Sequence, residues 1–248
     1  MKRLLAAGSG AIYQMCKVFR QGEAGRNHNP EFTLIEWYQP GMHYRKLMEQ
    51  LDELVRLLLK GKLILSDSVS YTYQQVFEKF TGINPHTVNS QQLQTVLSKN
   101  NIQLHEQTLT HDAYLDLIMS SLVQPALPKG KPVFIYDYPP AQAALANIRQ
   151  GEINVAERFE LFINSIELAN GYQELLDASE QQQRFENENK QRLAAGQQTI
   201  PVDDHLISAL QRGMPMVSGV ALGFERVLML ATGKDSIRDV IAFTTDKA

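Results

Sequence analysis

A strand-like stretch of the sequence ends in Arg20, a residue type that suits phosphate binding. The planar guanidinium of arginine makes paired contacts with phosphate oxygens. Arg26, His28 and Asn29 follow in a polar loop that contains two glycines and a proline, and such a loop can reach over a ligand. The plainer alternative is a solvated polar hairpin tip.

Two carboxylates, Glu167 and Glu174, follow an apolar strand-like run together with Asn170. Acidic groups that lie close together repel each other unless a cation sits between them. Mg²⁺ prefers oxygen ligands and commonly bridges phosphates. The segment therefore suggests a metal-assisted phosphate site, whereas surface acids at a strand end are the alternative.

Residues 218–226 combine small side chains with Arg226. Small residues allow a strand to approach a flat ligand closely. Arg226 falls in the first turn of a predicted helix, whose N-terminus adds partial positive charge for a phosphate. The glycine spacing matches neither a dinucleotide fingerprint nor a P-loop, and close strand packing is the alternative.

Alternating and helical apolar patterns predict the elements that would hold these residues. Residues 11–20 and 31–40 form a hairpin of two strands, and Leu47, Leu51, Leu54 and Leu58 form one face of a helix. The other predicted elements are helical pieces over 72–122, strands at 132–137, 154–169 and 217–222, and helices at 177–194, 203–212 and 223–232. Because strands and helices do not alternate regularly, we predict one α+β domain with a mainly antiparallel sheet flanked by helices.

The composition is that of a globular protein of 248 residues, with 44% hydrophobic and 21% charged residues. The net charge of −3 provides no basic field for a nucleic acid, so we expect no tRNA partner. A single cysteine, Cys16, fits a reducing cytoplasm. Gly8 and Gly10 interrupt the short apolar N-terminal stretch, which argues against a signal peptide, and no apolar run is long enough to cross a membrane.

The three segments, in this order, resemble motif 2, the metal-binding acidic strand and motif 3 of class II aminoacyl-tRNA synthetases, in particular the lysine branch. The strings that carry this likeness are 28–33 (HNPEFT), Glu36, 167–171 (ELANG) and 219–226 (GVALGFER). A still closer resemblance is to the family of elongation factor P (R)-β-lysine ligases, carried by 36–40 (EWYQP), 155–160 (VAERFE), 166–171 (IELANG) and 219–223 (GVALG). It implies motif 2 at 11–40, a helical insertion at about 43–125, metal and ATP strands at 154–175, and motif 3 at 217–232.

The resemblance implies activation of (R)-β-lysine by ATP and Mg²⁺ as an acyl-adenylate, followed by transfer to a lysine of elongation factor P. It also implies a homodimer in the full-length protein. Two alternatives remain: the catalytic domain of a lysyl-tRNA synthetase that uses lysine, and an inactive fragment that binds a nucleotide or a partner protein.

By the same resemblance, each site residue acquires an expected role. Arg20 and Arg226 are the catalytic pair, on the α- and γ-phosphates. The residues expected to bind ATP are Arg20, Gln21, Gly22, Asn29, Glu167, Leu168, Gly223 and Arg226. The residues expected to bind the amino acid are Tyr38, Asn170, Glu174 and Ala221, and those expected to bind the metal are Glu167 and Glu174. Lysyl-tRNA synthetases carry glycine where this sequence has Ala221, and one methyl group shifts substrate preference by about 1–3 kcal/mol.

The sequence departs from the family pattern in two places. Motif 2 often has an acid two residues after its arginine, but Gly22 stands there and the acid is Glu23. In addition, Met1 aligns within the family's catalytic domain, after motif 1 and a Ser-Pro-Glu segment that contacts the amino acid. We therefore expect the sequence to be an N-terminally truncated catalytic domain.

Overall fold

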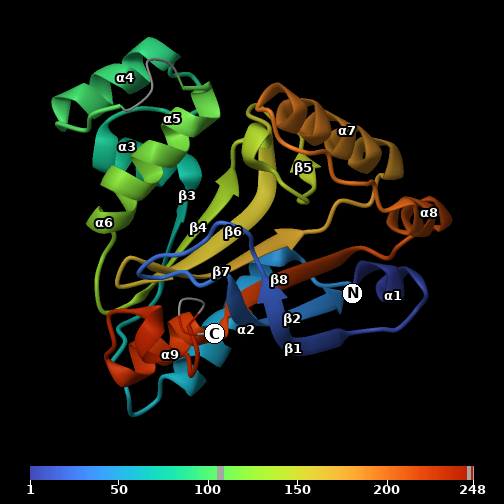
Figure 1. Cartoon of the computed structure of the whole chain (residues 1–248), viewed down its shortest axis with the longest axis horizontal. Helices are drawn as coiled ribbons and strands as arrows, with labels where there is room; N and C mark the ends of the chain where they lie inside the picture. Colours follow the sequence, from blue (N-terminus) through green and yellow to red (C-terminus); the bar gives the residue numbers. More distant parts are fainter. Residues whose placement is uncertain (105–108, 245–246, 248) are drawn as a thin grey trace.

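The computed structural model describes residues 1–104, 109–244 and 247. Within these residues, eight strands form one sheet in the order β1-β2-β8-β7-β6-β4-β3, and β5 also pairs with β6 (Figure 1). The strands are β1 (Ile12–Phe19), β2 (Glu31–Pro40), β3 (Val69–Thr72), β4 (Pro132–Tyr138), β5 (Ile148–Arg149), β6 (Val155–Ile163), β7 (Ile166–Gln173) and β8 (Val217–Gly223). All described pairs are antiparallel except β3 with β4, so the predicted α+β fold with a mainly antiparallel sheet is confirmed.

Helices α2 (Tyr44–Leu58) and α9 (Phe224–Thr232) pack against one face of this sheet. The buried stripe of α2 includes Leu47, Leu51 and Val55, each fully buried, beside Tyr44 and Met48. The predicted stripe was partly wrong, because Leu58 is 41% exposed. The four-residue steps from Leu47 lead through Leu51 to Val55, which takes the buried position at this end of the helix.

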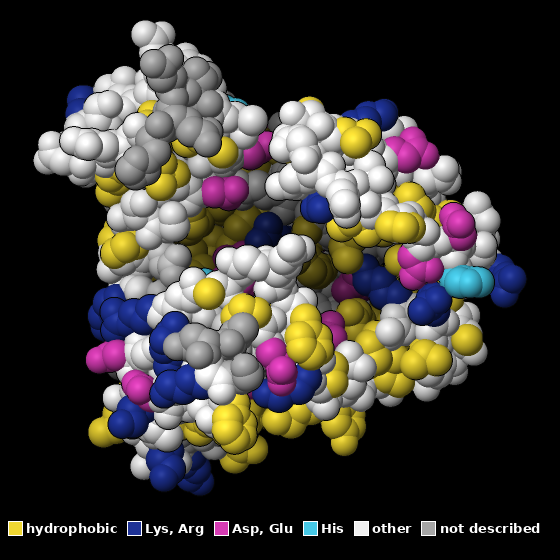
Figure 2. Space-filling model, in the orientation of Figure 1, with side chains coloured by type: hydrophobic (Ala, Val, Ile, Leu, Met, Phe, Trp, Pro, Cys, Tyr) yellow, Lys and Arg dark blue, Asp and Glu magenta, His cyan; other side chains and the backbone are white. Residues whose placement is uncertain are grey.

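The opposite face is covered at its two ends and open in the middle. At the β3–β4 end lie α3 (Tyr73–Thr81), α4 (Ser90–Lys99), α5 (His111–Ile118), a π-helical turn (Met119–Val123) and α6 (Gln124–Ala126). At the other end lie α1 (Lys2–Ala6), α7 (Ala178–Ala194) and α8 (Asp204–Arg212). Figure 2 shows the resulting hollow at the centre of the molecule, with hydrophobic side chains inside it and charged side chains of both signs around it.

The structure differs from the sequence-based expectation mainly over residues 43–125. This stretch contains α2, which packs on the central sheet, and β3, which is a strand of that sheet, so the helical piece that stands apart begins at α3. Residues 105–108 of the predicted helical stretch lie outside the described residues. The short helix α1 was not predicted. In the part of the chain that the structure describes, no helix is long and apolar enough to span a membrane.

Candidate active site

The floor of the central hollow is the β8 strand and its neighbours. Successive side chains of a strand point to opposite faces, so Gly219, Ala221 and Gly223 share one face. The strand register sets Ala221 opposite Glu36 on β2 and opposite Asn170 on β7. The smallest side chains thus lie where the sheet is uncovered, and the floor can receive a flat ligand.

The two ends of this floor differ in how tightly they are packed. A Cβ atom added at Gly219 would lie 2.4 Å from the ring of Tyr38 and 2.8 Å from Oε1 of Glu174. A Cβ atom at Gly223 would meet nothing closer than 3.6 Å, which is an ordinary contact. The Gly219 end is therefore already filled by protein, and the Gly223 end has free space.

A cavity opens to solvent at the Gly223 end. Its walls come from the β1–β2 hairpin, β7, β8 and α9. Eight of the predicted site residues line it: Arg20, Asn29, Glu167, Leu168, Asn170, Ala221, Gly223 and Arg226.

Arg226 ties three segments of this cavity together from the first turn of α9. Its Nη1 donates to the carbonyl oxygen of Glu167 over 2.7 Å, and its Nε donates to the carbonyl oxygen of Asn27 over 3.3 Å. Its Nη2 lies 2.8 Å from Nε2 of His28. The hairpin loop and β7 therefore hold the guanidinium in one orientation, facing the cavity.

The preceding residue, Glu225, anchors α9 to the hairpin. Its buried carboxylate accepts hydrogen bonds from the backbone nitrogen of Thr33 over 2.9 Å and from its hydroxyl over 2.7 Å. The ammonium of Lys17 lies 3.6 Å from Oε1 of this carboxylate. Because Glu225 and Arg226 are neighbours, this anchor sets where the arginine enters the cavity.

Arg20 lies just beyond the end of β1 and is 57% exposed at its side chain. Its guanidinium lies 5.5 Å from the centre of the Phe32 ring and 3.5 Å from the carboxylate of Glu23. The acid shifted by one residue thus still reaches Arg20. The chain turns at Gly22, where φ is +79°, and neither Gln21 nor Gly22 is among the residues that line the cavity.

Glu167 is one of three carboxylates that line the cavity, with Glu23 and Glu225. Enclosure by protein, together with the nearby carboxylate of Glu160, raises the pKa of Glu167 to about 7, although Arg226, Arg158 and Arg20 oppose this shift. His28 responds in the opposite direction: burial and the charge of Arg226 lower its pKa. A cationic ligand group or a metal ion beside Glu167 would favour its ionised form.

Glu174 lies at the opposite end of the floor and is only 2% exposed. Its carboxylate forms an ion pair with the ammonium of Lys2, which α1 carries. Burial raises the pKa of Glu174, whereas Lys2 lowers it. The Tyr38 hydroxyl lies beside this pair, 3.5 Å from Oε1 of Glu36, and burial and these two glutamates raise the pKa of Tyr38 well above its usual value.

The structure separates the two carboxylates that the sequence placed together. Glu167 lies at the start of β7 and Glu174 just after its end. Seven residues of extended chain span about 23 Å, a spacing that does not favour binding of one cation by both side chains. A metal site shared by the two carboxylates stays a prediction. Among the described residues, no group of three or more His, Cys, Asp or Glu side chains is arranged to hold a metal by itself.

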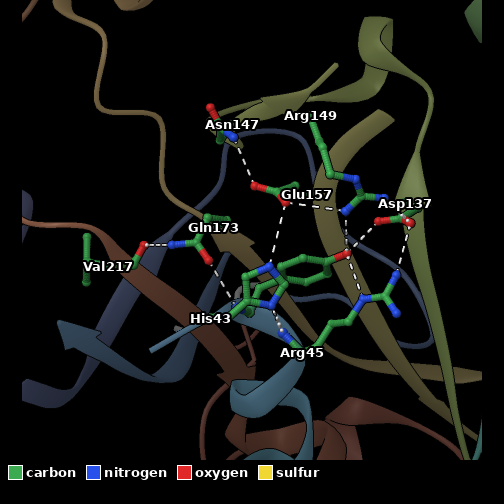
Figure 3. A network of polar contacts seen from close by, with 9 residues as sticks. His43, Arg45, Asp137, Asn147, Arg149, Glu157, Gln173 and Val217 are labelled. Carbon is green, nitrogen blue, oxygen red and sulfur yellow. Dashed lines mark hydrogen bonds and ion pairs between the residues drawn. The ribbon is translucent and has the colours of Figure 1, made fainter. Parts of the chain in front are cut away.

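A polar network lies around the start of α2 (Figure 3). Asp137 adopts a φ of +59° at an irregularity in β4, and its carboxylate accepts from the Tyr44 hydroxyl over 2.5 Å and from Arg149 over 2.6 Å. Nη2 of Arg45 also donates to the Asp137 carboxylate, over 3.3 Å. Arg149 also reaches Glu157, which accepts from Asn147 over 2.9 Å.

Gln173 connects this network to the floor of the site. Its side chain accepts from the backbone nitrogen of Tyr44 over 3.1 Å and donates to the carbonyl oxygen of Val217 over 2.9 Å. The same carbonyl accepts from the backbone nitrogen of Glu174 over 3.0 Å. The network therefore fixes the backbone that presents Glu174, from the side of the sheet away from the hollow.

The architecture and the cavity agree with comparisons to known proteins. The family model of class II tRNA synthetases (D, K and N) matches residues 1–247. The chain belongs to this family. It is 45% identical over its whole length to proteins named elongation factor P–(R)-β-lysine ligase from Edwardsiella ictaluri, Pseudoalteromonas translucida and Salmonella arizonae, and spans 75%, 76% and 75% of these relatives. As a member of the class II synthetase family with these relatives, the chain is a ligase.

Two charged residues of this class II domain were not among the predicted site residues. Arg158 and Glu160 of β6 are paired with each other, and the Arg158 guanidinium lies 4.4 Å from the centre of the Tyr138 ring. Glu160 lies opposite Asn170, so the pair borders the floor. The signal was present in the sequence, because charged residues two apart within an apolar strand point to one face.

Proposed function

We propose that this chain activates (R)-β-lysine with ATP and transfers the acyl group to a lysine of elongation factor P. The observation that carries the proposal is a single open floor with a cavity that holds two arginines at one end and a buried carboxylate at the other. Along β8, Gly219 and Gly223 are four residues apart, or about 13 Å. That length accommodates an amino acid held by its amine at the Gly219 end, with its carboxylate directed towards a nucleotide at the Gly223 end.

ATP would bind in the cavity. Arg226, held by the carbonyls of Glu167 and Asn27, would contact the γ-phosphate, and Arg20 the α-phosphate. Adenine would lie against Gly223, where space remains. Asn29 would hold the nucleotide from the hairpin, where its Nδ2 donates to the carbonyl of Glu31 over 2.6 Å.

The residues present fit a magnesium ion that is bound mainly by phosphates. Mg²⁺ usually keeps several waters and takes one or two carboxylates, and Glu167 is the cavity carboxylate placed to supply one. When bound, the ion would neutralise phosphate charge. The spacing along β7 does not favour Glu174 for the same ion, and we assign Glu174 to the amino acid instead.

The amino acid would lie over Asn170 and Ala221, with its ammonium at Glu174 and its chain beside Tyr38. A carboxylate oxygen would attack the α-phosphorus and release pyrophosphate, which forms the acyl-adenylate. The ε-amine of the acceptor lysine would then attack the acyl carbon and release AMP. These residues orient the reactants and stabilise charge, and no protein nucleophile is required.

The Ala221 methyl group would raise the floor under the acyl chain relative to a glycine. A net charge of −3 also favours a protein acceptor over the phosphate backbone of a tRNA. A homodimer and a cytoplasmic location complete the proposal, by analogy with the family.

Pyrophosphate exchange tests the proposal directly. The purified chain is incubated with ATP and labelled pyrophosphate, with either (R)-β-lysine or α-lysine, and with elongation factor P in a parallel reaction analysed by mass spectrometry. We expect exchange with (R)-β-lysine and a β-lysyl mass increase on the acceptor. Preference for α-lysine together with acylation of tRNA would refute the proposal and identify a lysyl-tRNA synthetase.

A further inference from the structure

Lys2 occupies the position that the proposed function reserves for a substrate amine. Its ammonium pairs with Glu174, and the side chains are 12% and 2% exposed. Helix α1 holds Lys2 in place because Leu5, 1% exposed, packs into a core cluster with Leu210 of α8. The pair is therefore a buried ion pair rather than a loose surface contact.

A second carboxylate, Glu36, lies at the same end of the floor, and its negative charge raises the pKa of Glu174. Its oxygens face the Tyr38 hydroxyl at 3.5 Å and the Gln14 amide at 2.9 Å. Lys2, Glu36 and Tyr38 all line one surface opening, so the ammonium of Lys2 has a way out of the buried position. This end of the floor thus holds two carboxylates and one resident ammonium.

We propose that Lys2 is a specificity-determining residue, which occupies Glu174 in the free protein and must be displaced by the amine of the substrate. This inference rests on the proposed function, because it takes Glu174 as the amine acceptor. A substrate without an ammonium cannot replace Lys2, since it would leave a buried carboxylate unpaired. Lys2 therefore lowers the affinity for every substrate, because each must displace it. The loss of affinity is smallest for a substrate whose amine reaches Glu174.

Two substitutions of Lys2 have opposite expected effects. Lys2→Met keeps the apolar stem and removes the competing charge, so the affinity for (R)-β-lysine should rise by about tenfold. Lys2→Arg keeps the charge and adds a planar fork that can hold a carboxylate with two hydrogen bonds, so the affinity should fall. A purely structural role of Lys2 would instead weaken binding in Lys2→Met and preserve it in Lys2→Arg.

Calorimetry with (R)-β-lysine on the wild-type chain and both variants measures these affinities without requiring turnover. Arg3→Met is the matched control, because Arg3 lies next in α1 with 57% of its side chain exposed and only a distant contact of 3.8 Å to Asp203. Its affinity for (R)-β-lysine should equal that of the wild type. Affinity for ATP should be the same in all four proteins.

Chemical acetylation read by mass spectrometry provides a second measurement, on the wild-type chain alone. We expect (R)-β-lysine to increase the modification of Lys2, while Lys17, 51% exposed, reacts equally with and without it. If Lys2→Met binds no more tightly than the wild type, or if the substrate leaves Lys2 protected, the inference is overturned. If the wild-type chain binds no (R)-β-lysine at all, the proposed function itself fails, which is a separate outcome.

Discussion

Adding one methyl group at Gly219 or at Gly223 should separate the two ends of the site. Both positions lie on the same face of β8, and Gly219 and Gly223 both lack the left-handed backbone conformation that would forbid alanine. The main difference between Gly219→Ala and Gly223→Ala is the space around the new methyl group, and Gly223 is in addition the N-cap of α9. The pair serves as its own control.

The contacts give the size of the difference. At Gly219 the new Cβ would lie 2.4 Å from two ring carbons of Tyr38, whereas carbon atoms rest at about 3.5–4.0 Å, so the ring must move by more than about 1 Å. Tyr38 packs against a core cluster, and such overpacking costs about 1–3 kcal/mol. At Gly223 the nearest atom is 3.6 Å away, so no overpacking arises. The lower entropy of the unfolded alanine chain stabilises by about 0.4–1 kcal/mol, and the loss of glycine at the N-cap of α9 opposes this, so the net change is small.

Urea unfolding followed by circular dichroism measures the stability difference, and pyrophosphate exchange measures the function. We expect Gly219→Ala to lose stability and to raise the KM for (R)-β-lysine. Gly223→Ala should keep its stability and raise the KM for ATP, because the methyl group would occupy the surface assigned to adenine. Equal stabilities of the two variants, or a raised KM for ATP in Gly219→Ala alone, would refute the assignment of the two ends.

Three further outcomes follow from the site. Because the pKa of Glu167 is raised from 4.5 to about 7, the folded state binds the extra proton between these values, and the free energy of unfolding falls as pH rises through them. Glu167→Gln should therefore be more stable than the wild type at pH 8, by about 1 kcal/mol once the 37% exposure of the Glu167 side chain is taken into account. The variant should lose this advantage below about pH 4.5. Thermal unfolding across pH tests this, and a stability difference that does not change with pH would contradict it. Thr33→Val removes the hydroxyl bond to buried Glu225 and should lower the free energy of unfolding by about 1–3 kcal/mol, whereas an unchanged urea midpoint would show that the anchor is dispensable. Ala221→Gly should shift the ratio of kcat/KM for (R)-β-lysine and α-lysine towards α-lysine by about 10-fold or more, measured by pyrophosphate exchange, and an unchanged ratio would exclude a role of this methyl group in selectivity.

Most secondary structure could be predicted because its signals are local. The β1–β2 hairpin follows from alternating side chains on both sides of a polar loop, and its observed pairing runs from Ile12 with Tyr38 to Phe19 with Glu31. The strand β8 and helix α9 follow from a run of small residues ahead of a helical pattern. By contrast, β3 is only four residues long and pairs in parallel with β4, so its stability comes from a partner far away in sequence.

The residues that line the cavity were easier to predict than the geometry of the cavity. The residue types at Arg20, Glu167 and Arg226 indicated phosphate chemistry, and the structure brings all three to one cavity. Gln21 and Gly22 were expected there too, yet they shape the turn beside it. Their placement depends on how the hairpin loop closes, which residue types alone do not specify.

The sequence was enough to predict most strands and helices, the class II synthetase family and the main charged side chains of the site. How those charges are paired depends on the tertiary structure. Glu167 and Glu174 are close in sequence, but an extended strand carries them to opposite ends of the floor. Lys2 and Glu174 are remote in sequence, but the packing of α1 on α8 brings them into contact. Pairing of charges depends on distance in space, and the sheet sets that distance independently of distance along the chain.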